Sequence, residues 1–507
     1  MFVMEKPASL KKPLNVLWLM TDQHHAFAMG CAGHPDVKTP HLDKLAASGV
    51  RFERAYCNNP VCAPSRSTFL TGQHPHTHGV LGNDVFNYTD TLPPNIGSHF
   101  RENGYEAAMV GKGHLPKSWM EAGFETLRYC DLADAERHDP RTCHYFDYLV
   151  QQGIADDYDH GKLYPPHPGS MMRAFESKIP QEHSLEVWTG NEALRFLENR
   201  DADRPFFLKV SFQRPHDPHA VSPEKMGMYD PEALTLPENA RDYLVTKFKG
   251  KPKYQEDYVK EGNEGYPYRA HDEADLRRQL SFYLTLVTII DEQIGRILSY
   301  LEETGQWENT VIAYNADHGD FAGEHGLMLK NMGIFEAIHR IPFLVRWPQG
   351  PKTVCHELVE SVDFVPTMCA AAGIPELTTA EGRDLRLVAD GEESGLDHTV
   401  CEWDFPKEQQ RTVFAVRTQT HRLVFYLNQP DDGELYNMID DPGEMENFWD
   451  SSEHLALRER LLRNILCHVG SFHRNYTFKQ DRDQPKENPV KQIHVGGKSW
   501  LEISSSI

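Results

Sequence analysis

One stretch of the chain decides the fold class: EADLRRQLSFYLTLVTIIDEQIGRILSYLEETGQWENTVIAYNADHGD, residues 273–320. Leucine, isoleucine and valine recur every three or four residues from Leu276 to Leu301, which predicts one long helix over residues 273–303. Gly305 follows the end of this helix. An apolar run at 311–315 comes next, has the pattern of a buried strand, and ends in polar residues. A long helix that leads directly into a buried strand is typical of an α/β fold.

The same alternation of short apolar runs and longer helical patterns extends over most of the chain. It predicts a large mixed, mostly parallel sheet with helices packed on it. The segment from Tyr129 to Glu273 is rich in Pro, Gly, Asp, His and Tyr, so we expect loops there, over the sheet edge or over a site. The candidate buried strands are residues 15–20, 107–110, 206–212, 311–315 and 343–346.

A smaller unit is expected after the main sheet. Residues 373–394 change in composition to Gly, Glu, Pro, Thr and Asp, which indicates a linker. Beyond it, residues 412–416 and 422–427 have the pattern of hairpin strands, and residues 453–469 that of a helix. We therefore divide the chain into a catalytic domain (1–380), a C-terminal α+β subdomain with a short antiparallel sheet (395–473) and a polar tail (474–507). We expect the tail to contact another subunit of a homo-oligomer.

Length, charge and cysteine pattern limit the classes of function. The 507 residues exceed the roughly 250–300 that a single core holds. The 52 basic and 75 acidic side chains give a net charge of −23, which argues against a nucleic-acid partner, because phosphate backbones recruit Lys and Arg. No apolar run approaches the roughly 18 residues of a membrane span, so we expect no membrane partner. Nine scattered cysteines without a CxxC pair argue against a disulfide framework and favour a cytoplasmic protein.

Polar side chains follow four of the predicted strands. The first strand ends in Asp22-Gln23, the second leads into the segment 111–114, the third into 213–217 and the fourth into 316–320. Ligands of parallel sheets bind beyond the carboxyl ends of the strands, so these four strand ends should meet at one rim. The rim is therefore the candidate functional site.

The residue types at this rim suit a divalent metal ion and a small anion. Asp22, Asp317 and Gln23 offer oxygen ligands, which favour Ca²⁺, Mg²⁺ or Mn²⁺, and His318 adds a nitrogen. Positive charge and proton transfer around a bound anion would come from Lys112, His114 and His216.

The segment NNPVCAPSRSTFLTG, residues 58–72, carries the most specific motif. Its Cys-x-Pro-Ser-Arg, followed by Thr-Gly, resembles the signature of the formylglycine-dependent sulfatases of the alkaline phosphatase superfamily. Further blocks, among them YEAAMVGKGH, NADHGDFAGEHG and RIPFLVRWP, resemble sulfatase segments and stand in the family's order. The resemblance covers most of the chain, except residues 115–205 and the tail after residue 474. It implies an alkaline phosphatase-like fold, with helices on both faces of the large sheet, and hydrolysis of a sulfate ester to inorganic sulfate and an alcohol.

The family pattern implies roles for individual residues. A formylglycine-generating enzyme would oxidise Cys62 to formylglycine, whose hydrate is the nucleophile. Ca²⁺ ranks first for the metal, with Mn²⁺ and Mg²⁺ as alternatives. Asp320 is expected to support the site, and the role of His325 stays open. The implied metal ligands are Asp22, Gln23, Cys62, Asp317 and His318, and the implied catalytic residues are Cys62, Arg66, Lys112, His114, His216 and Lys330.

Two features bear on the choice of substrate. The pairs Asp22-Gln23 and Asp317-His318 resemble those of choline sulfatases and phosphonate monoester hydrolases, so hydrolysis of phosphonate monoesters or phosphodiesters is the alternative activity. Lys112, His114 and Ser65 favour a true sulfatase. A non-catalytic anion-binding relative is a third alternative, against which the complete set of basic residues speaks.

The sulfate ester itself stays open between an aryl, a sugar and a small alkyl sulfate. Several residues near the motifs could line a substrate pocket, although packing or surface roles account for each equally well. They are His339, Trp119, His74, His76, Asn83 and Asp84.

Overall fold

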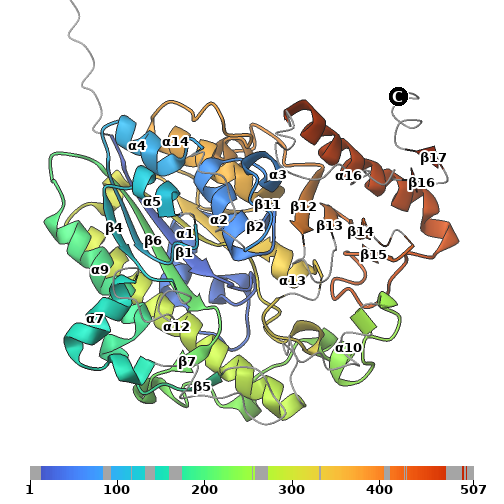
Figure 1. The fold of residues 1–507 in the computed structure, drawn as a ribbon, viewed down its shortest axis with the longest axis horizontal. Coiled ribbons are helices and arrows are strands. Elements are labelled where there is room, and N and C mark those ends of the chain that lie inside the picture. Colours follow the sequence, from blue (N-terminus) through green and yellow to red (C-terminus); the bar gives the residue numbers. More distant parts are fainter. Residues whose placement is uncertain are drawn as a thin grey trace, which may run out of the picture.

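The computed structural model describes residues 13–83, 93–115, 117–131, 143–158, 174–253, 255–256, 272–330, 333–404, 412–427, 429, 431–475, 494–495 and 498–499. A mixed nine-stranded sheet forms its centre, in the order β11-β2-β10-β8-β1-β6-β3-β4, with β9 paired to β2 (Figure 1). Its strands are β1 (Asn15–Asp22), β2 (Val50–Tyr56), β3 (Glu106–Gly111), β4 (Thr126–Tyr129), β6 (Phe206–Pro215), β8 (Thr310–Ala316), β9 (Arg340–Ile341), β10 (Phe343–Arg346) and β11 (Thr353–Glu360).

The middle of this sheet is parallel. β1 pairs in parallel with β6 and with β8, and β3 pairs in parallel with β6 and with β4. β10 runs antiparallel to β8 and β2, which makes the sheet mixed. Because β1, β3, β6 and β8 run in the same direction, their carboxyl ends lie at one edge of the sheet. The prediction of a mostly parallel α/β sheet is confirmed.

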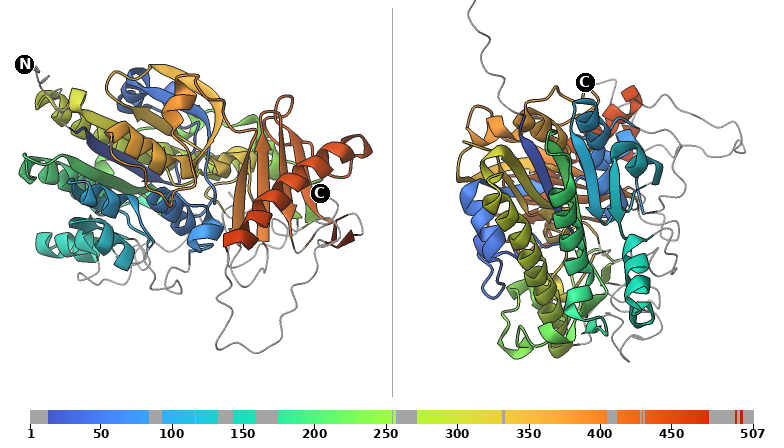
Figure 2. Two further views of the ribbon diagram at one scale, coloured as in Figure 1. Left: turned by 90° about the horizontal axis from the view of Figure 1, so that it is seen from above. Right: turned by 90° about the vertical axis from the view of Figure 1, so that its left-hand side faces the viewer.

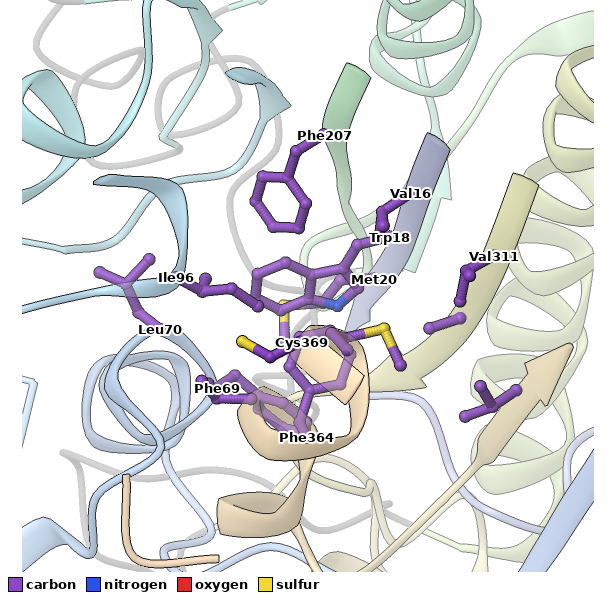
Figure 3. Close-up of a cluster of buried hydrophobic side chains, with 14 of the residues drawn as sticks. Val16, Trp18, Met20, Phe69, Leu70, Ile96, Phe207, Val311, Phe364 and Cys369 are labelled. Carbon is purple, nitrogen blue, oxygen red and sulfur yellow. The ribbon is translucent and has the colours of Figure 1, made fainter. Parts of the chain in front are cut away.

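Helices cover both faces of the sheet, and the residues of β1 alternate between them. Val16, Trp18 and Met20 enter the core with α2 (Cys62–Thr71), α4 (Ile96–Glu102) and α14 (Phe364–Ala372) (Figure 3). In that core the rings of Trp18 and Phe364 lie 4.5 Å apart between centroids. Leu17 and Leu19 face the opposite core with α1 (Pro40–Ser48), α9 (Leu185–Asn199) and α12 (Glu273–Glu303). A strand buried on both faces explains the continuous apolar run that the sequence shows there.

A separate antiparallel sheet follows the main sheet in the chain. Its order is β12 (His398–Asp404), β13 (Thr412–Thr418), β14 (His421–Tyr426) and β15 (Gly433–Asn437), and α16 (Leu455–Asn475) lies diagonally across it (Figure 2, left). The remaining elements named below or outside these sheets are α3 (Pro75–His78), α5 (Lys117–Gly123), α7 (His144–Gln152), α10 (Arg241–Leu244), α13 (Glu336–His339), α15 (Leu385–Ala389), β5 (Ala174–Glu176), β7 (His219–Val221), β16 (His494–Val495) and β17 (Lys498–Ser499).

The structure corrects the sequence-based elements in two places and extends them in a third. The region in which loops are expected contains the fifteen-residue helix α9, which packs against α12 so closely that a Cβ on Gly190 would lie 2.8 Å from Oε1 of Gln293. Part of the expected linker is helical, as α15. The expected hairpin is confirmed as β13 and β14, and β12 and β15 extend it to a four-stranded antiparallel sheet. In the part of the chain that the structure describes, no helix is both long and apolar enough to cross a membrane.

Candidate active site

The strand ends converge as their sequence pattern predicts. Asp22 ends β1, Lys112 follows β3, His216 follows β6, and Asp317 and His318 follow β8. Cys62 meets them from the first turn of α2, a helix whose ten residues are all buried. The side chains of Asp22, Arg66, Asp317 and His318 have no exposed surface, and Cys62 is 1% exposed. The strand ends and α2 thus enclose one buried polar centre.

Arg66 holds two carboxylates in fixed positions. Its Nη2 donates to Oδ2 of Asp22 at 3.0 Å, and its Nε donates to Oδ2 of Asp317 at 2.7 Å. Nη1 donates to Oγ of Ser211 at 2.8 Å, and the Lys112 ammonium forms a second ion pair with Asp22. A buried carboxylate needs such partners, because removal of its hydration is costly. The two aspartates are therefore held in place by the protein itself.

The sulfur of Cys62 lies at the centre of the site. It is 3.3 Å from Nε2 of His318, 3.5 Å from Nζ of Lys330 and 3.7 Å from Oδ1 of Asp22. Nδ1 of His318 lies 2.9 Å from the carbonyl oxygen of Gly319, which suits a proton on Nδ1 and leaves the Nε2 lone pair directed at the centre. An interaction with His114 helps to lower the pKa of the Cys62 thiol, and an interaction with Cys62 helps to raise the pKa of His216.

Gln23 is oriented by residues on three sides. Its side-chain Nε2 donates to Oδ2 of Asp320 at 2.7 Å, so its Oε1 turns the other way and accepts from Lys330. Its backbone N–H donates to Oδ1 of Asp317 at 3.0 Å, and its carbonyl accepts from the Tyr283 hydroxyl at 3.1 Å. Lys330 also contacts Cys62, so the amide oxygen of Gln23 faces the same centre as the other predicted ligands.

Charge at the site favours an anion next to residue 62. Burial would raise the pKa of the Cys62 thiol, but Lys112, Lys330 and His318 lower it well below its usual value. Burial also opposes the charge of Lys330, yet Cys62 and Asp22 raise its pKa above the usual range. The pKa of His216 is raised, because Asp22 and Asp217 outweigh burial and the Lys330 charge. Lys112, Lys330 and His216 thus place positive charge around residue 62 and form a binding site for a small negatively charged group.

Sequence reasoning misses two residues that hold this site together. Ser211 lies within β6 and binds Arg66, and Tyr283 lies within α12 and binds Gln23. Both stand inside segments whose pattern indicates only core packing, so the sequence carries no separate signal for them. The expected supporting role of Asp320 agrees with its contact to Gln23.

The other candidates lie outside the set of metal donors. His325 packs beside Phe335 and bonds Asp242, with Nδ1 2.9 Å from the Oδ2 of that aspartate. Trp119 is 2% exposed within the hydrophobic core, and both ring nitrogens of His339 are buried beside the ring of Tyr56. Asn83 accepts from the backbone N–H of Ala63, and His74 and His76 lie in a separate cluster described below. Asp84 and most of the tail lie outside the described residues.

The donor set at the centre fits a divalent cation. One ligand atom from each of Asp22, Cys62, Asp317 and His318 lies within 4.8 Å of the others, and all four residues are buried. Two carboxylates and one imidazole at this spacing are ligands that Ca²⁺, Mg²⁺ and Mn²⁺ accept. Cys62 contributes sulfur here, in the position of the oxygen that a formylglycine hydrate would contribute.

A sequence model of the family described as Sulfatase matches residues 14–374. The chain belongs to the sulfatase family. Its fold is that of the alkaline phosphatase superfamily, and it is a sulfuric ester hydrolase. A second model, described as N-sulphoglucosamine sulphohydrolase, C-terminal, matches residues 323–469.

Individual relatives agree with this assignment. This sulfatase is 26% identical to an N-acetylglucosamine-6-O-sulfatase of Bacteroides thetaiotaomicron, over 97% of this chain and 91% of that protein. Its fold is similar to a solved phosphonate monoester hydrolase of Agrobacterium radiobacter, with a TM-score of 0.74, 23% identity and coverage of 90% and 96%. A solved complex of another protein with its substrate D-glucosamine-2-N,6-O-disulfate has a TM-score of 0.70, 24% identity and coverage of 93% and 100%. These two structures support the fold.

Proposed function

We propose that this sulfatase hydrolyses the sulfate ester of a sugar, using formylglycine made from Cys62 and one divalent metal ion. The observation that carries the proposal is the convergence of Lys112, Lys330, His114 and His216 on residue 62, which forms one cluster of metal donors with Asp22, Asp317 and His318. The sugar class is supported by the similarity to the N-acetylglucosamine-6-O-sulfatase, which extends over 97% of the chain. Among the open ester classes, sugar sulfates therefore come before aryl and small alkyl sulfates.

The proposed metal ligands are Asp22, Asp317, His318, residue 62 and the amide oxygen of Gln23. Mostly oxygen donors favour Ca²⁺, with Mn²⁺ and Mg²⁺ as the alternatives. When bound, such an ion supplies positive charge that polarises the sulfate oxygens and acidifies the nucleophilic hydroxyl.

The remaining chemistry falls to side chains of the chain. A hydrated formylglycine at position 62 supplies one hydroxyl to attack sulfur and a second whose deprotonation expels the sulfate. Lys112 and Lys330 neutralise charge that develops on the sulfate oxygens. His216, whose raised pKa favours the protonated ring, donates a proton to the leaving alcohol. His114 removes a proton from the second hydroxyl. Arg66 orients Asp22 and Asp317 throughout.

Phosphonate monoester or phosphodiester hydrolysis is the second candidate activity. One observation favours it: the fold matches the phosphonate monoester hydrolase with a TM-score of 0.74. Both activities need the same cations and nucleophile, so the ratio of kcat/KM on paired sulfate and phosphonate esters separates them.

The decisive experiment combines mass spectrometry with a substrate panel. Peptide analysis of active enzyme should find an aldehyde at Cys62, and sugar sulfates should give a higher kcat/KM than aryl and alkyl sulfates or aryl phosphonates. Cys62→Ala should lose turnover, while Cys57→Ala, which removes a buried thiol outside the ligand set, should keep it. Fully active enzyme with only a thiol at residue 62 would overturn the mechanism. A higher kcat/KM on phosphonates would overturn the substrate assignment.

Three further predictions accompany this proposal. The chain is expected to be a cytoplasmic homo-oligomer, to be matured by a formylglycine-generating enzyme, and to divide into units at 1–380, 395–473 and 474–507. Size-exclusion chromatography with light scattering measures the oligomeric state directly.

A further inference from the structure

A second cluster of metal-binding side chains lies outside the candidate active site. His76, Glu402 and His468 each place one ligand atom within 4.8 Å of the others. His76 belongs to α3, Glu402 to β12 and His468 to α16, so three elements that are distant in sequence meet there. The end of α16 lies beside α3 (Figure 1). The ring of His468 contacts the rings of His74 and His76 there.

A third imidazole lies beside this cluster. The ring of His74 stacks on that of His76, with 5.4 Å between centroids and 5° between planes. The ring of His468 stands nearly perpendicular to both, at 5.2 Å from His74 and 4.8 Å from His76. Nδ1 of His74 is buried and has no hydrogen-bond partner among the described residues. A buried ring nitrogen without a partner costs free energy, which a bound cation would recover.

Glu402 supplies the negative charge. Its Oε1 lies 2.8 Å from Nδ1 of His76 and its Oε2 lies 3.8 Å from Nε2 of His468. Among the described residues, no lysine or arginine forms an ion pair with this carboxylate. The cluster therefore carries a net negative charge when its histidines are neutral.

We propose that His74, His76, Glu402 and His468 form a second metal site, which binds Zn²⁺. Three imidazoles and one carboxylate are a ligand set typical of tetrahedral Zn²⁺, whereas the oxygen-rich active site favours a harder ion. Coordination takes the place of the hydrogen bond between His76 and Glu402, and the single ring proton of neutral His76 stays on its other nitrogen. The ion fastens α16 to α3, the segment that directly follows the helix of Cys62 and Arg66. This site is independent of the proposed substrate.

The test uses full-length protein in which the active site has lost two metal donors, the double variant Cys62→Ser/Asp317→Asn. After chelator treatment, Co²⁺ is titrated in place of Zn²⁺, and its visible bands report the coordination geometry. We expect about one Co²⁺ per chain with the intense bands of a tetrahedral site, displaced by Zn²⁺.

Additional substitutions in this background locate the ion. Glu402→Gln and His468→Gln should weaken binding by more than the roughly 10–100-fold that loss of an outer-sphere partner causes. His468 is 12% exposed near the end of α16, so its variant tests the site with little effect on the core. The matched control is His356→Gln, which breaks a His–Glu pair with Glu53 on the surface and should leave binding unchanged.

Stability gives a second readout. Zn²⁺ should raise the Tm of the double variant and leave the Tm of its His468→Gln derivative unchanged, because only the folded site binds the ion. The proposal is overturned if the double variant binds no ion. It is also overturned if Glu402→Gln and His468→Gln, made in that background, bind the ion as tightly as the double variant does. Loss of binding in His356→Gln would place the ion elsewhere and would also overturn it.

Discussion

Asp320→Asn should rotate the side-chain amide of Gln23, so that its oxygen and nitrogen exchange places, while the surrounding fold stays intact. Oδ1 of Asp320 accepts from the backbone N–H groups of Ala322 and Leu329, at 2.7 and 2.9 Å, and Oδ2 accepts from Nε2 of Gln23. Asparagine keeps its oxygen on the two backbone donors and therefore directs its NH₂ group at the Gln23 NH₂ group. Two donors repel each other, so the glutamine amide rotates and its oxygen leaves the metal centre.

The size of the effect follows from the contacts that change. The rotation removes the hydrogen bond that Nε2 of Gln23 donates to the Asp320 carboxylate. It also places the NH₂ group of Gln23 against the Lys330 ammonium, from which Oε1 of Gln23 accepted a hydrogen bond before. A hydrogen bond to a charged group contributes about 1.5–3 kcal/mol. That loss corresponds to a roughly 10–100-fold weaker affinity for the metal, since each 1.4 kcal/mol is a factor of ten.

Isothermal titration of chelator-treated protein with Ca²⁺ or Mn²⁺ measures this affinity. Asp363→Asn serves as the control, because Asp363 is also a buried carboxylate that accepts two backbone N–H groups but lies outside the ligand set. The double variant Gln23→Glu/Asp320→Asn should recover most of the affinity, since glutamate presents oxygen both to the amide introduced at position 320 and to the centre. Unchanged metal affinity in Asp320→Asn would refute the reasoning.

Three further substitutions test electrostatics, catalysis and packing. Burial and Asp363 raise the pKa of Glu360 to about 8, so this group's contribution to stability is complete below pH about 4.5 and is lost as the pH rises through 8. Glu360→Gln should therefore raise the Tm increasingly from pH 5 to pH 8, and a pH-independent difference would contradict this. Lys112→Ala should lower kcat by about 100–1000-fold, whereas Lys225→Ala, at a partly exposed ion pair outside the site, should leave kcat unchanged. Phe364→Ala should cost about 3–5 kcal/mol of stability, and the half-exposed Phe27→Ala much less, by calorimetry.

Much of the fold follows from the sequence because the central strands are buried on both faces. All eight residues of β1 are buried, and the five from Val16 to Met20 form an uninterrupted apolar run. β2 and β11 include partly exposed or exposed positions, and their weaker patterns do not identify them as strands. α9 escapes prediction because Gly190 interrupts a helical pattern. Glycine is needed there because α9 approaches α12 closely, which only the three-dimensional structure shows.

The candidate site follows from the sequence to a similar degree. Its charged residues stand at strand ends, and parallel strands bring such ends together. The contacts that orient them do not follow, because Ser211 and Tyr283 lie inside core segments. The sequence suggests His76 as a residue near a substrate pocket, but the structure pairs it with Glu402, which lies 326 positions away in the sequence. Pairings over such distances depend on topology, which no local pattern encodes.

The complete burial of α2 has a consequence for the order of events during synthesis. Cys62 begins a helix with no exposed residue, so another enzyme can reach its thiol only before this helix packs onto β1. The proposed oxidation of Cys62 then competes with folding of the nascent chain, and the yield of aldehyde depends on the time between synthesis of residue 62 and arrival of β8, which completes the enclosure. Protein that folds first would keep its thiol permanently, and adding the maturing enzyme afterwards would convert it only through unfolding.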